Sequence, residues 1–176
     1  MTNLHFYYMV FFLIGLPGCG KSTLGRKFAH VIKHPFYDLD HSIEAGENAK
    51  IADLFMHHGE QKFRELEHKY LREIQGLEKA VVATGGGTPC FFNNMEVINN
   101  LGMSVFLDVS PKEIAHRLSE TGISKRPMLQ GKSREEISIT LEHIRHIRLP
   151  FYQQCHITIS NPDIQFGENL LLDFVK

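Results

Sequence analysis

The chain has 176 residues, of which 43% are hydrophobic and 22% are charged. This length and composition indicate one globular domain with a core of its own, and they argue against collagen-like, coiled-coil and disordered chains. The 19 lysines and arginines nearly balance the 20 aspartates and glutamates. There is no overall positive charge to hold nucleic acid, so we expect no nucleic-acid partner.

The first apolar stretch of the chain, residues 6–16, is too short to cross a bilayer, which takes about 20 apolar residues. It also lacks the basic start of a secretory signal, so we interpret residues 9–14 as a strand buried on both faces. The three cysteines are widely spaced, which favours a reducing compartment. We therefore expect a cytoplasmic protein with no membrane partner.

Apolar runs alternate with amphipathic segments along the chain. The expected strands are residues 9–14, 35–39, 80–84, 103–109 and 156–160. The expected helices are residues 22–32, 51–58, 60–77, 93–101, 111–119, 134–148 and 165–175. Alternation of this kind predicts a parallel sheet with helices on both faces. We expect a three-layer α/β/α fold around a mostly parallel five-stranded sheet, in one domain over residues 1–176.

Residues 15–22 read G-L-P-G-C-G-K-S and match the phosphate-binding pattern G-x-x-x-x-G-K-[ST]. The motif stands between an expected strand and an expected helix, so backbone N–H groups and the helix N-terminus would both face a phosphate. Lys21 can reach the β- and γ-phosphates, and the Ser22 hydroxyl can bind Mg²⁺. The pattern therefore predicts a nucleoside-triphosphate site. Its expected ATP-binding residues are Gly18, Cys19, Gly20, Lys21, Ser22 and Thr23.

Two carboxylates, Asp38 and Asp40, stand at positions i and i+2 at the end of the second expected strand. In an extended segment they would point the same way, and toward the phosphate end of the sheet if this strand lies beside the first. One could hold Mg²⁺ through water. The other could orient an attacking hydroxyl or accept its proton. The alternative is a pair of solvated or helix-capping acids.

Two arginines continue the apolar stripes of different helices. Arg64 lies three residues from Glu67, which can hold its guanidinium in place for the carboxylate of a ligand. Arg148 follows the stripe of its helix just before Leu149 and Pro150, where we expect the helix to end. Together the two arginines suggest one acidic substrate. The alternatives are a structural ion pair at Arg64 and a helix-dipole charge at Arg148.

The third expected strand runs into three glycines, Gly85, Gly86 and Gly87. Because they lack side chains, a ligand could lie against the backbone and bond to its N–H groups; a flexible turn is the alternative. Many phosphate-loop proteins place an acid at the end of such a strand to hold Mg²⁺, and this chain has Thr84 there. The metal-binding role therefore falls to Asp38.

Residues 121–133 are polar, basic and interrupted by proline and glycine, and we expect a mobile loop between two helices. Within this loop, Pro127 biases Arg126 toward an extended backbone. An arginine that closes over a bound triphosphate could stabilise charge on the transferring group. A solvated basic loop is the alternative.

Six sequence blocks occur in order along residues 9–159. They are G-L-P-G-C-G-K-S, F-Y-D-L-D, G-E-x-x-F-R-x-x-E, the G-G-G after a strand, R-P-M-L and R-L-P-F-Y. Together they resemble the shikimate kinases, within the nucleoside-monophosphate-kinase-like P-loop proteins. The resemblance implies a P-loop NTPase fold with a lid over about residues 121–133 and a substrate-binding helical region over about residues 41–77. It also implies phosphorylation of the 3-hydroxyl of shikimate by ATP with Mg²⁺, in aromatic amino-acid biosynthesis.

By position, the resemblance also implies roles for single residues. The implied catalytic residues are Lys21, Asp40 and Arg126, with Asp40 as the candidate base and Arg126 also at the ATP. The implied substrate-binding residues are Asp40, Arg64, Gly85, Gly86, Gly87 and Arg148. Mg²⁺ would be held by Ser22 and, through water, by Asp38.

Two other functions remain open at this point. One is a kinase for another small hydroxylated acid, such as gluconate, on the same scaffold. The other is a nucleotide-binding module that lacks turnover. Nothing in the sequence requires more than one copy of the chain, so we expect a monomer.

Overall fold

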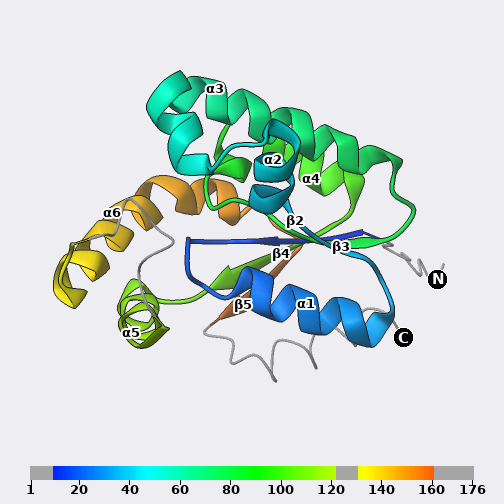
Figure 1. Ribbon diagram of the computed structural model, residues 1–176. Helices are drawn as coiled ribbons and strands as arrows, with labels where there is room; N and C mark the ends of the chain where they lie inside the picture. The colour runs from blue at the N-terminus through cyan, green and yellow to red at the C-terminus, as the bar shows by residue number, and fades with distance from the viewer. Residues whose placement is uncertain (1–9, 122–130, 161–176) are drawn as a thin grey trace.

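The computed structural model describes residues 10–121 and 131–160. Its centre is a sheet of five parallel strands in the order β2-β3-β1-β4-β5 (Figure 1). The strands are β1 (Val10–Ile14), β2 (Phe36–Asp38), β3 (Ala80–Ala83), β4 (Met103–Asp108) and β5 (Ile157–Ser160). The expected five-stranded parallel sheet is confirmed. The helix expected at residues 165–175 and most of the loop expected at residues 121–133 lie outside the described residues.

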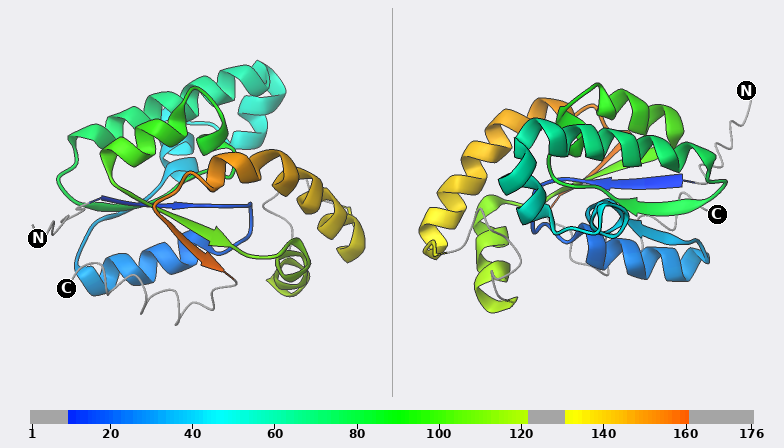
Figure 2. Two further views of the ribbon diagram at one scale, coloured as in Figure 1. Left: turned by 180° about the vertical axis from the view of Figure 1, so that it is seen from behind. Right: turned by 45° about the horizontal axis from the view of Figure 1, so that its top comes forward.

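Helices cover both faces of the sheet, so the expected three-layer fold is confirmed. Helix α1 lies on one face, and α3 and α4 lie on the other (Figure 1, Figure 2). The helices are α1 (Lys21–Ile32), α2 (Leu39–Glu47), α3 (Ile51–Glu73), α4 (Asn94–Leu101), α5 (Pro111–Thr121) and α6 (Arg134–Tyr152). The short 3₁₀ helices are η1 (Ile74–Gly76) and η2 (Thr88–Cys90). None of the helices in the described part of the chain is long and apolar enough to cross a membrane.

The core is built on strands whose sequences are unbroken apolar runs. Every residue of β1 is buried, and so is every residue of β3. Phe11 of β1 packs edge-on against Phe28 of α1, with 5.0 Å between the ring centroids. A strand covered on both faces needs apolar residues at successive positions rather than at alternate ones, which is why such runs predict strands here.

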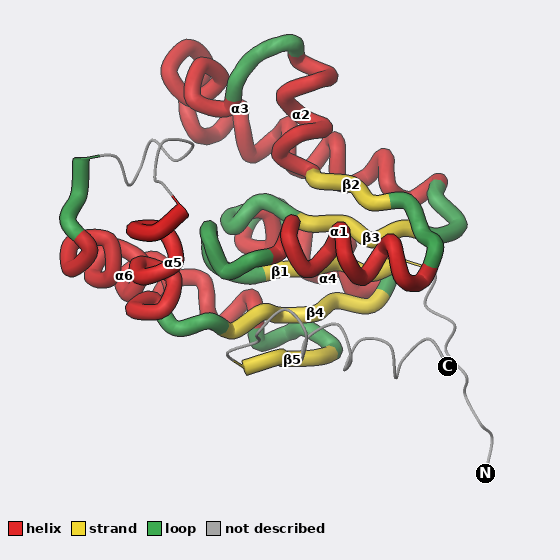
Figure 3. The backbone as a smooth tube through the Cα atoms, turned by 60° about the horizontal axis from the view of Figure 1, so that its bottom comes forward, coloured by secondary structure: helices red, strands yellow, loops and turns green. Residues whose placement is uncertain are grey.

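Parallel pairing places the carboxyl ends of the strands at one edge of the sheet (Figure 3). Leu13 of β1 pairs with Ala83 of β3 and with Val105 of β4, and Asp38 of β2 pairs with the same Ala83. The loop after β1, the first turn of α2 and the glycines after β3 are therefore neighbours. In open α/β sheets, ligands bind at this edge.

The boundary between the second strand and the next helix differs from the expected one. Strand β2 ends at Asp38, and α2 begins at Leu39, which we expected in the strand. The reason is a helix cap: the Asp38 carboxylate accepts a hydrogen bond from the N–H of His41 at 3.4 Å. An aspartate in this position satisfies a backbone donor that the first turn of a helix leaves free.

The expected end of the last described helix is also wrong. Helix α6 runs beyond Arg148 to Tyr152, with Pro150 inside it. A proline removes one helical N–H donor, but the N–H of Gln153 still donates to the carbonyl of Leu149 at 2.9 Å. Tyr152 is fully buried. We attribute the longer helix to the burial of this side chain, which outweighs the local preference against proline.

Helix α3 is interrupted at Gly59, where the sequence predicted a break between two helices. Gly59 has φ 76° and ψ 174°, a conformation that is almost exclusive to glycine. The kink separates the first turns of α3 from the segment that carries Arg64 and Glu67. It therefore sets the direction of that segment relative to the first turns of the helix.

We expect Gly59→Ala to lower the free energy of unfolding by about 1–3 kcal/mol, because alanine is strained at this φ. A Cβ at Gly59 would meet no atom within 4 Å, so only the backbone term changes. Gly76→Ala is the matched control: its Cβ would also have open space, and its φ is not positive. We expect the control to be neutral or slightly stabilising. Equal losses in urea unfolding of both variants would contradict this explanation.

Candidate active site

The phosphate-binding motif forms the loop between β1 and α1, as expected. Gly15, Gly18 and Gly20 have positive φ values of 141°, 91° and 102°. At Gly15 space is limiting as well, because a Cβ there would lie 2.8 Å from the carbonyl oxygen of Leu107 in β4. Residues with side chains rarely adopt such φ values, so these glycines allow the tight turn that a phosphate cradle needs.

Lys21 is the first residue of α1 and is buried. Its Nζ donates to the carbonyl oxygens of Gly15 and Leu16, each at 2.9 Å, and lies 3.8 Å from the Sγ of the buried Cys19. The ammonium therefore closes the loop on itself. A phosphate entering the loop would compete with these two carbonyls for the ammonium.

Ser22 and Asp38 bring two oxygen ligands together beside the loop. The Ser22 hydroxyl donates to Oδ2 of Asp38 at 2.6 Å, whereas the neighbouring Thr23 is exposed. Mg²⁺ prefers oxygen ligands, so this pair fits the ion that the sequence implies. The Thr84 hydroxyl is turned elsewhere and donates to the carbonyl of Leu13 at 3.2 Å.

Asp40 lies in the first turn of α2, whereas Asp38 ends β2. The two acids therefore do not share one extended segment, and the expected i, i+2 geometry is wrong. Strand β2 also lies beside β3 and not beside β1. Asp40 nevertheless reaches the expected edge: a Cβ at Gly85 would lie 2.7 Å from Oδ1 of Asp40 and 2.5 Å from Oε1 of Glu67.

Burial is the largest of the causes that raise the pKa of Asp40 from 3.8 to about 6. The negative charges of Glu67 and Asp38 are the next largest and act in the same direction. Glu44 adds a smaller effect in the same direction, while Lys21 opposes it. A carboxylate with a pKa close to neutrality is suited to accept a proton at neutral pH. Asp40 therefore has the chemistry of a general base.

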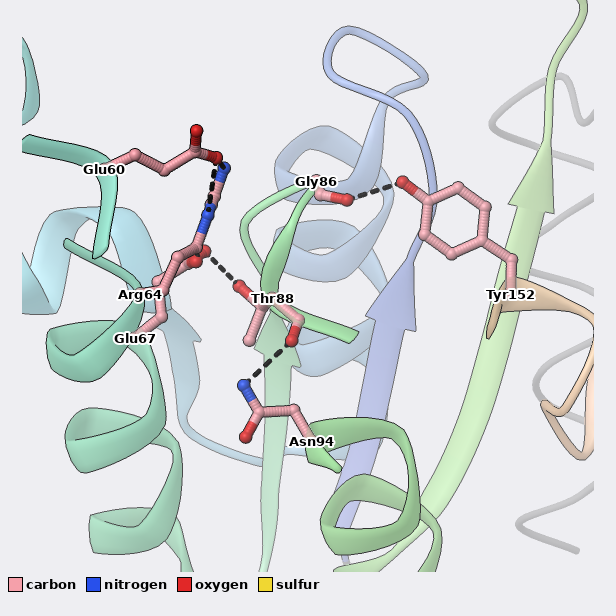
Figure 4. A network of polar contacts seen from close by, with 7 residues as sticks. All are labelled: Glu60, Arg64, Glu67, Gly86, Thr88, Asn94 and Tyr152. Atoms are coloured by element: carbon pink, nitrogen blue, oxygen red, sulfur yellow. Dashed lines mark hydrogen bonds and ion pairs between the residues drawn. The ribbon is translucent and has the colours of Figure 1, made fainter. Parts of the chain in front are cut away.

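Arg64 is buried in α3 between two glutamates of the same helix (Figure 4). Its Nη1 donates to Oε2 of Glu67 at 2.7 Å, and its Nε and Nη2 donate to Oε1 of Glu60 at 3.2 and 2.9 Å. Its Cζ also lies 4.5 Å from the ring centroid of Phe91. Burial lowers the pKa of Arg64, but Glu67 and Glu60 outweigh burial and raise it. The guanidinium therefore remains charged.

The three glycines after β3 lie against both expected arginines. A Cβ at Gly87 would lie 2.5 Å from Nη1 of Arg64, and a Cβ at Gly86 would lie 3.1 Å from Nη1 of Arg148. Two guanidinium groups from different helices thus meet one stretch of bare backbone. Arg148 is not at the end of its helix, which argues against the alternative that it serves only as a helix-end charge.

Arg126 lies outside the described residues, so its place at the ATP stays a prediction. The described flanks of the expected lid are the end of α5 and the cap of α6. The Ser133 hydroxyl accepts from the N–H of Glu136 at 3.2 Å, and the Glu136 carboxylate accepts from the N–H of Ser133 at 2.7 Å. This capping box gives α6 a defined start after the loop.

Three further side chains belong to this site although the sequence analysis gave them no role: Glu60, Thr88 and Tyr152. Glu60 and Tyr152 stand in two of the six sequence blocks, and Glu60 also lies four residues before Arg64 on one helix. Thr88 has no local signal. The Thr88 hydroxyl bonds to a side chain of α3, and the Tyr152 hydroxyl donates to the carbonyl of Gly86 at 2.5 Å.

A family model described as shikimate kinase matches residues 17–176 of the chain. The chain belongs to the shikimate kinase family. Curated shikimate kinases from Bacteroides fragilis and Phocaeicola vulgatus are 44% and 46% identical to it over 145 and 143 residues. These matches cover 82% and 81% of this chain, and 80% and 81% of the two relatives. The resemblance carried by the six sequence blocks is confirmed.

Solved shikimate kinase structures share the fold. The crystal structure from Bacteroides thetaiotaomicron has a TM-score of 0.89 at 38% identity, and the match covers 95% of this chain and 98% of that one. The Acinetobacter baumannii shikimate kinase, solved in complex with shikimate, has a TM-score of 0.81 at 32% identity, with 96% and 92% covered. A deoxyadenosine kinase from M. mycoides, at 14% identity and a TM-score of 0.60, shows a shared fold alone.

In this shikimate kinase family member, the ionised Asp40 is expected to destabilise the fold, because its pKa is higher in the folded chain than in the unfolded one. The effect is absent below about pH 4, where the carboxyl is protonated in both states, and complete above about pH 6. We therefore expect Asp40→Asn to raise the free energy of unfolding by about 1–2 kcal/mol at pH 8 and much less at pH 4. Thermal unfolding without nucleotide or metal measures this difference.

Asp53→Asn is the control for removal of a carboxylate, since Asp53 is exposed in the first turn of α3. We expect this variant to lose about 0.5 kcal/mol, because an acid at a helix N-terminus is favourable. Stabilisation by Asp40→Asn that is the same at pH 4 and pH 8 would show that the charge of Asp40 is not its cause.

Proposed function

We propose that this chain transfers the terminal phosphoryl group of ATP to the 3-hydroxyl of shikimate. The observation that carries the proposal is the meeting of Arg64, Arg148 and Asp40 at three glycines beside the phosphate-binding loop. A small acid needs cations for its carboxylate, and a hydroxyl that attacks phosphorus needs a base. Family membership supports shikimate as that acid, as does the related Acinetobacter baumannii kinase solved with shikimate.

On the nucleotide side, the loop N–H groups and the N-terminus of α1 would hold the triphosphate. Lys21 would exchange its bonds to two loop carbonyls for bonds to the β- and γ-phosphates. Phosphate oxygens are charged acceptors and therefore bind an ammonium more strongly than carbonyls do. Ser22 and, through water, Asp38 would hold Mg²⁺, whose charge offsets that of the phosphates when it is bound.

On the acceptor side, Arg64 and Arg148 would bind the carboxylate of shikimate from α3 and α6. The three glycines would let the ring of the substrate lie against the backbone. Asp40 would take the proton of the 3-hydroxyl as that oxygen bonds to the γ-phosphorus. The bond from the γ-phosphorus to the bridging oxygen of ADP breaks in the same step, and ADP leaves.

Other parts of the proposal rest on the sequence. The lid over about residues 121–133 would close over the bound nucleotide, and its Arg126 would stabilise charge on the transferring group. The helical region over about residues 41–77 would carry the acceptor site. The protein would act as a monomer in the cytoplasm.

A coupled assay of ADP release, run with shikimate, with gluconate and without acceptor, tests the proposal. We expect turnover with shikimate and only background rates otherwise. Lys21→Met removes the ammonium that would face the phosphates, so this variant should be inactive. Any activity that remains in its preparation would come from a contaminating kinase. Faster turnover with gluconate would favour a kinase for another hydroxylated acid. No turnover above background with shikimate or gluconate would favour a nucleotide-binding module.

Two aspartate variants separate the base from the metal ligand. We expect Asp40→Asn to lower kcat about 100-fold or more at every Mg²⁺ concentration, which is the scale of general-base catalysis. Asp38→Asn should instead need more Mg²⁺ for half-maximal rate, because it acts through the metal. Initial rates against Mg²⁺ distinguish the two. Rescue of Asp40→Asn by excess Mg²⁺, with none for Asp38→Asn, would mean that the roles are reversed.

A further inference from the structure

Thr88 is a buried hydroxyl that no step of the proposed reaction uses. It begins η2, directly after the three glycines, and has no exposed surface. Its Oγ1 donates to Oε1 of Glu67 in α3 at 2.5 Å (Figure 4). A side chain without exposed surface cannot touch a substrate. The Thr88 hydroxyl can therefore act on the reaction only through its hydrogen bond to Glu67.

The two carboxylate oxygens of Glu67 have different partners. Oε2 accepts from Arg64 at 2.7 Å, and Oε1 accepts from Thr88. Glu67 is 1% exposed, so water cannot replace either partner, and an unpaired oxygen here would carry the full desolvation penalty of a charged group. With one donor on each oxygen, the plane of the carboxylate is fixed, and so is the side of Arg64 that it grips.

Thr88 is itself held in place from two directions. Its N–H donates to the carbonyl of Gly85 at 3.2 Å. Its carbonyl accepts from Nδ2 of the fully buried Asn94 at 2.8 Å (Figure 4). Oδ1 of Asn94 in turn lies 2.6 Å from Nδ1 of His68. The hydroxyl therefore reaches Glu67 from a fixed position rather than from a movable loop.

We propose that Thr88 is a positioning residue for the acidic substrate: it orients Glu67, and through Glu67 it orients the guanidinium of Arg64 against the glycines. The inference rests on the proposed role of Arg64 in binding the carboxylate of shikimate. Bidentate contact between guanidinium and carboxylate depends on angle as well as distance. A loss of orientation therefore weakens substrate binding even when the arginine is still present.

The primary test is Thr88→Val, which keeps the shape of the side chain and removes the donor. We expect KM for shikimate to rise about tenfold, the scale of one hydrogen bond to a charged group. KM for ATP and kcat should stay within about twofold. Thr88→Ser restores the hydroxyl and should return KM to within about threefold of the original. If the valine variant does not fold, Thr88→Ala carries the same expectation, because it removes the donor without apolar bulk.

Ser104→Ala is the control for loss of a buried hydroxyl. Ser104 is fully buried near the start of β4, so it lies at the amino-terminal end of the strand, away from the site. Its Oγ donates to Oδ1 of Asn99 at 2.6 Å. We expect this variant to be less stable in thermal unfolding while KM for shikimate is unchanged. A similar rise in KM from Ser104→Ala would mean that general destabilisation causes the effect, and it would overturn the proposal.

A double-mutant cycle with Arg64→Lys separates this inference from the function on which it rests. We expect Arg64→Lys to raise KM for shikimate, and Thr88→Val to add little in that background, because both act on one contact. If Arg64→Lys raises KM and Thr88→Val does not, Thr88 has no positioning role and the function stands. Full additivity would also overturn the role. An unchanged KM in Arg64→Lys would contradict both proposals.

Discussion

The parallel pairing of β1 between β3 and β4 is the constraint on which the site depends. In a parallel sheet all strands end at the same edge, so segments far apart in the chain become neighbours there. The loop after β1 presents backbone N–H groups, the helix after β2 presents a carboxylate, and the segment after β3 presents bare backbone. Helices α3 and α6 then add one arginine each. The residues that we propose for phosphate binding, proton transfer and acceptor binding are thereby brought to one place.

This edge concentrates charges that a stable core would avoid. Burial, together with repulsion by Glu67 and Asp38, raises the pKa of Asp40 to about 6. Glu67 is tolerated because Arg64 and Thr88 each bind one of its oxygens. One acid is therefore satisfied by its partners, while the acid beside it has a pKa near neutrality. Functional sites commonly depart from the rules of stable packing in this way.

Contiguous patterns account for most of the fold and for the phosphate loop. Unbroken apolar runs predict β1 and β3 because both faces of the sheet are covered. The motif at residues 15–22 predicts its own conformation because its glycines tolerate the required φ values. The two wrong boundaries have different causes. Helix α6 continues through Pro150 because Tyr152 is buried against other elements. Asp38 ends its strand for a local reason, because it caps α2 three residues away, as the helix-capping alternative allowed.

Contacts between residues that lie within one or two turns of the same helix could be predicted from the sequence alone. The pair Arg64 and Glu67 is such a case, because a helix makes neighbours of positions three apart. Contacts between groups on different helices and strands could not be predicted in this way. The contacts of Arg148 with the glycines and of Thr88 with Glu67 are of this kind. Those contacts follow from strand order and helix packing. Burial of apolar surface over the whole domain sets both, and no short stretch of sequence contains that information.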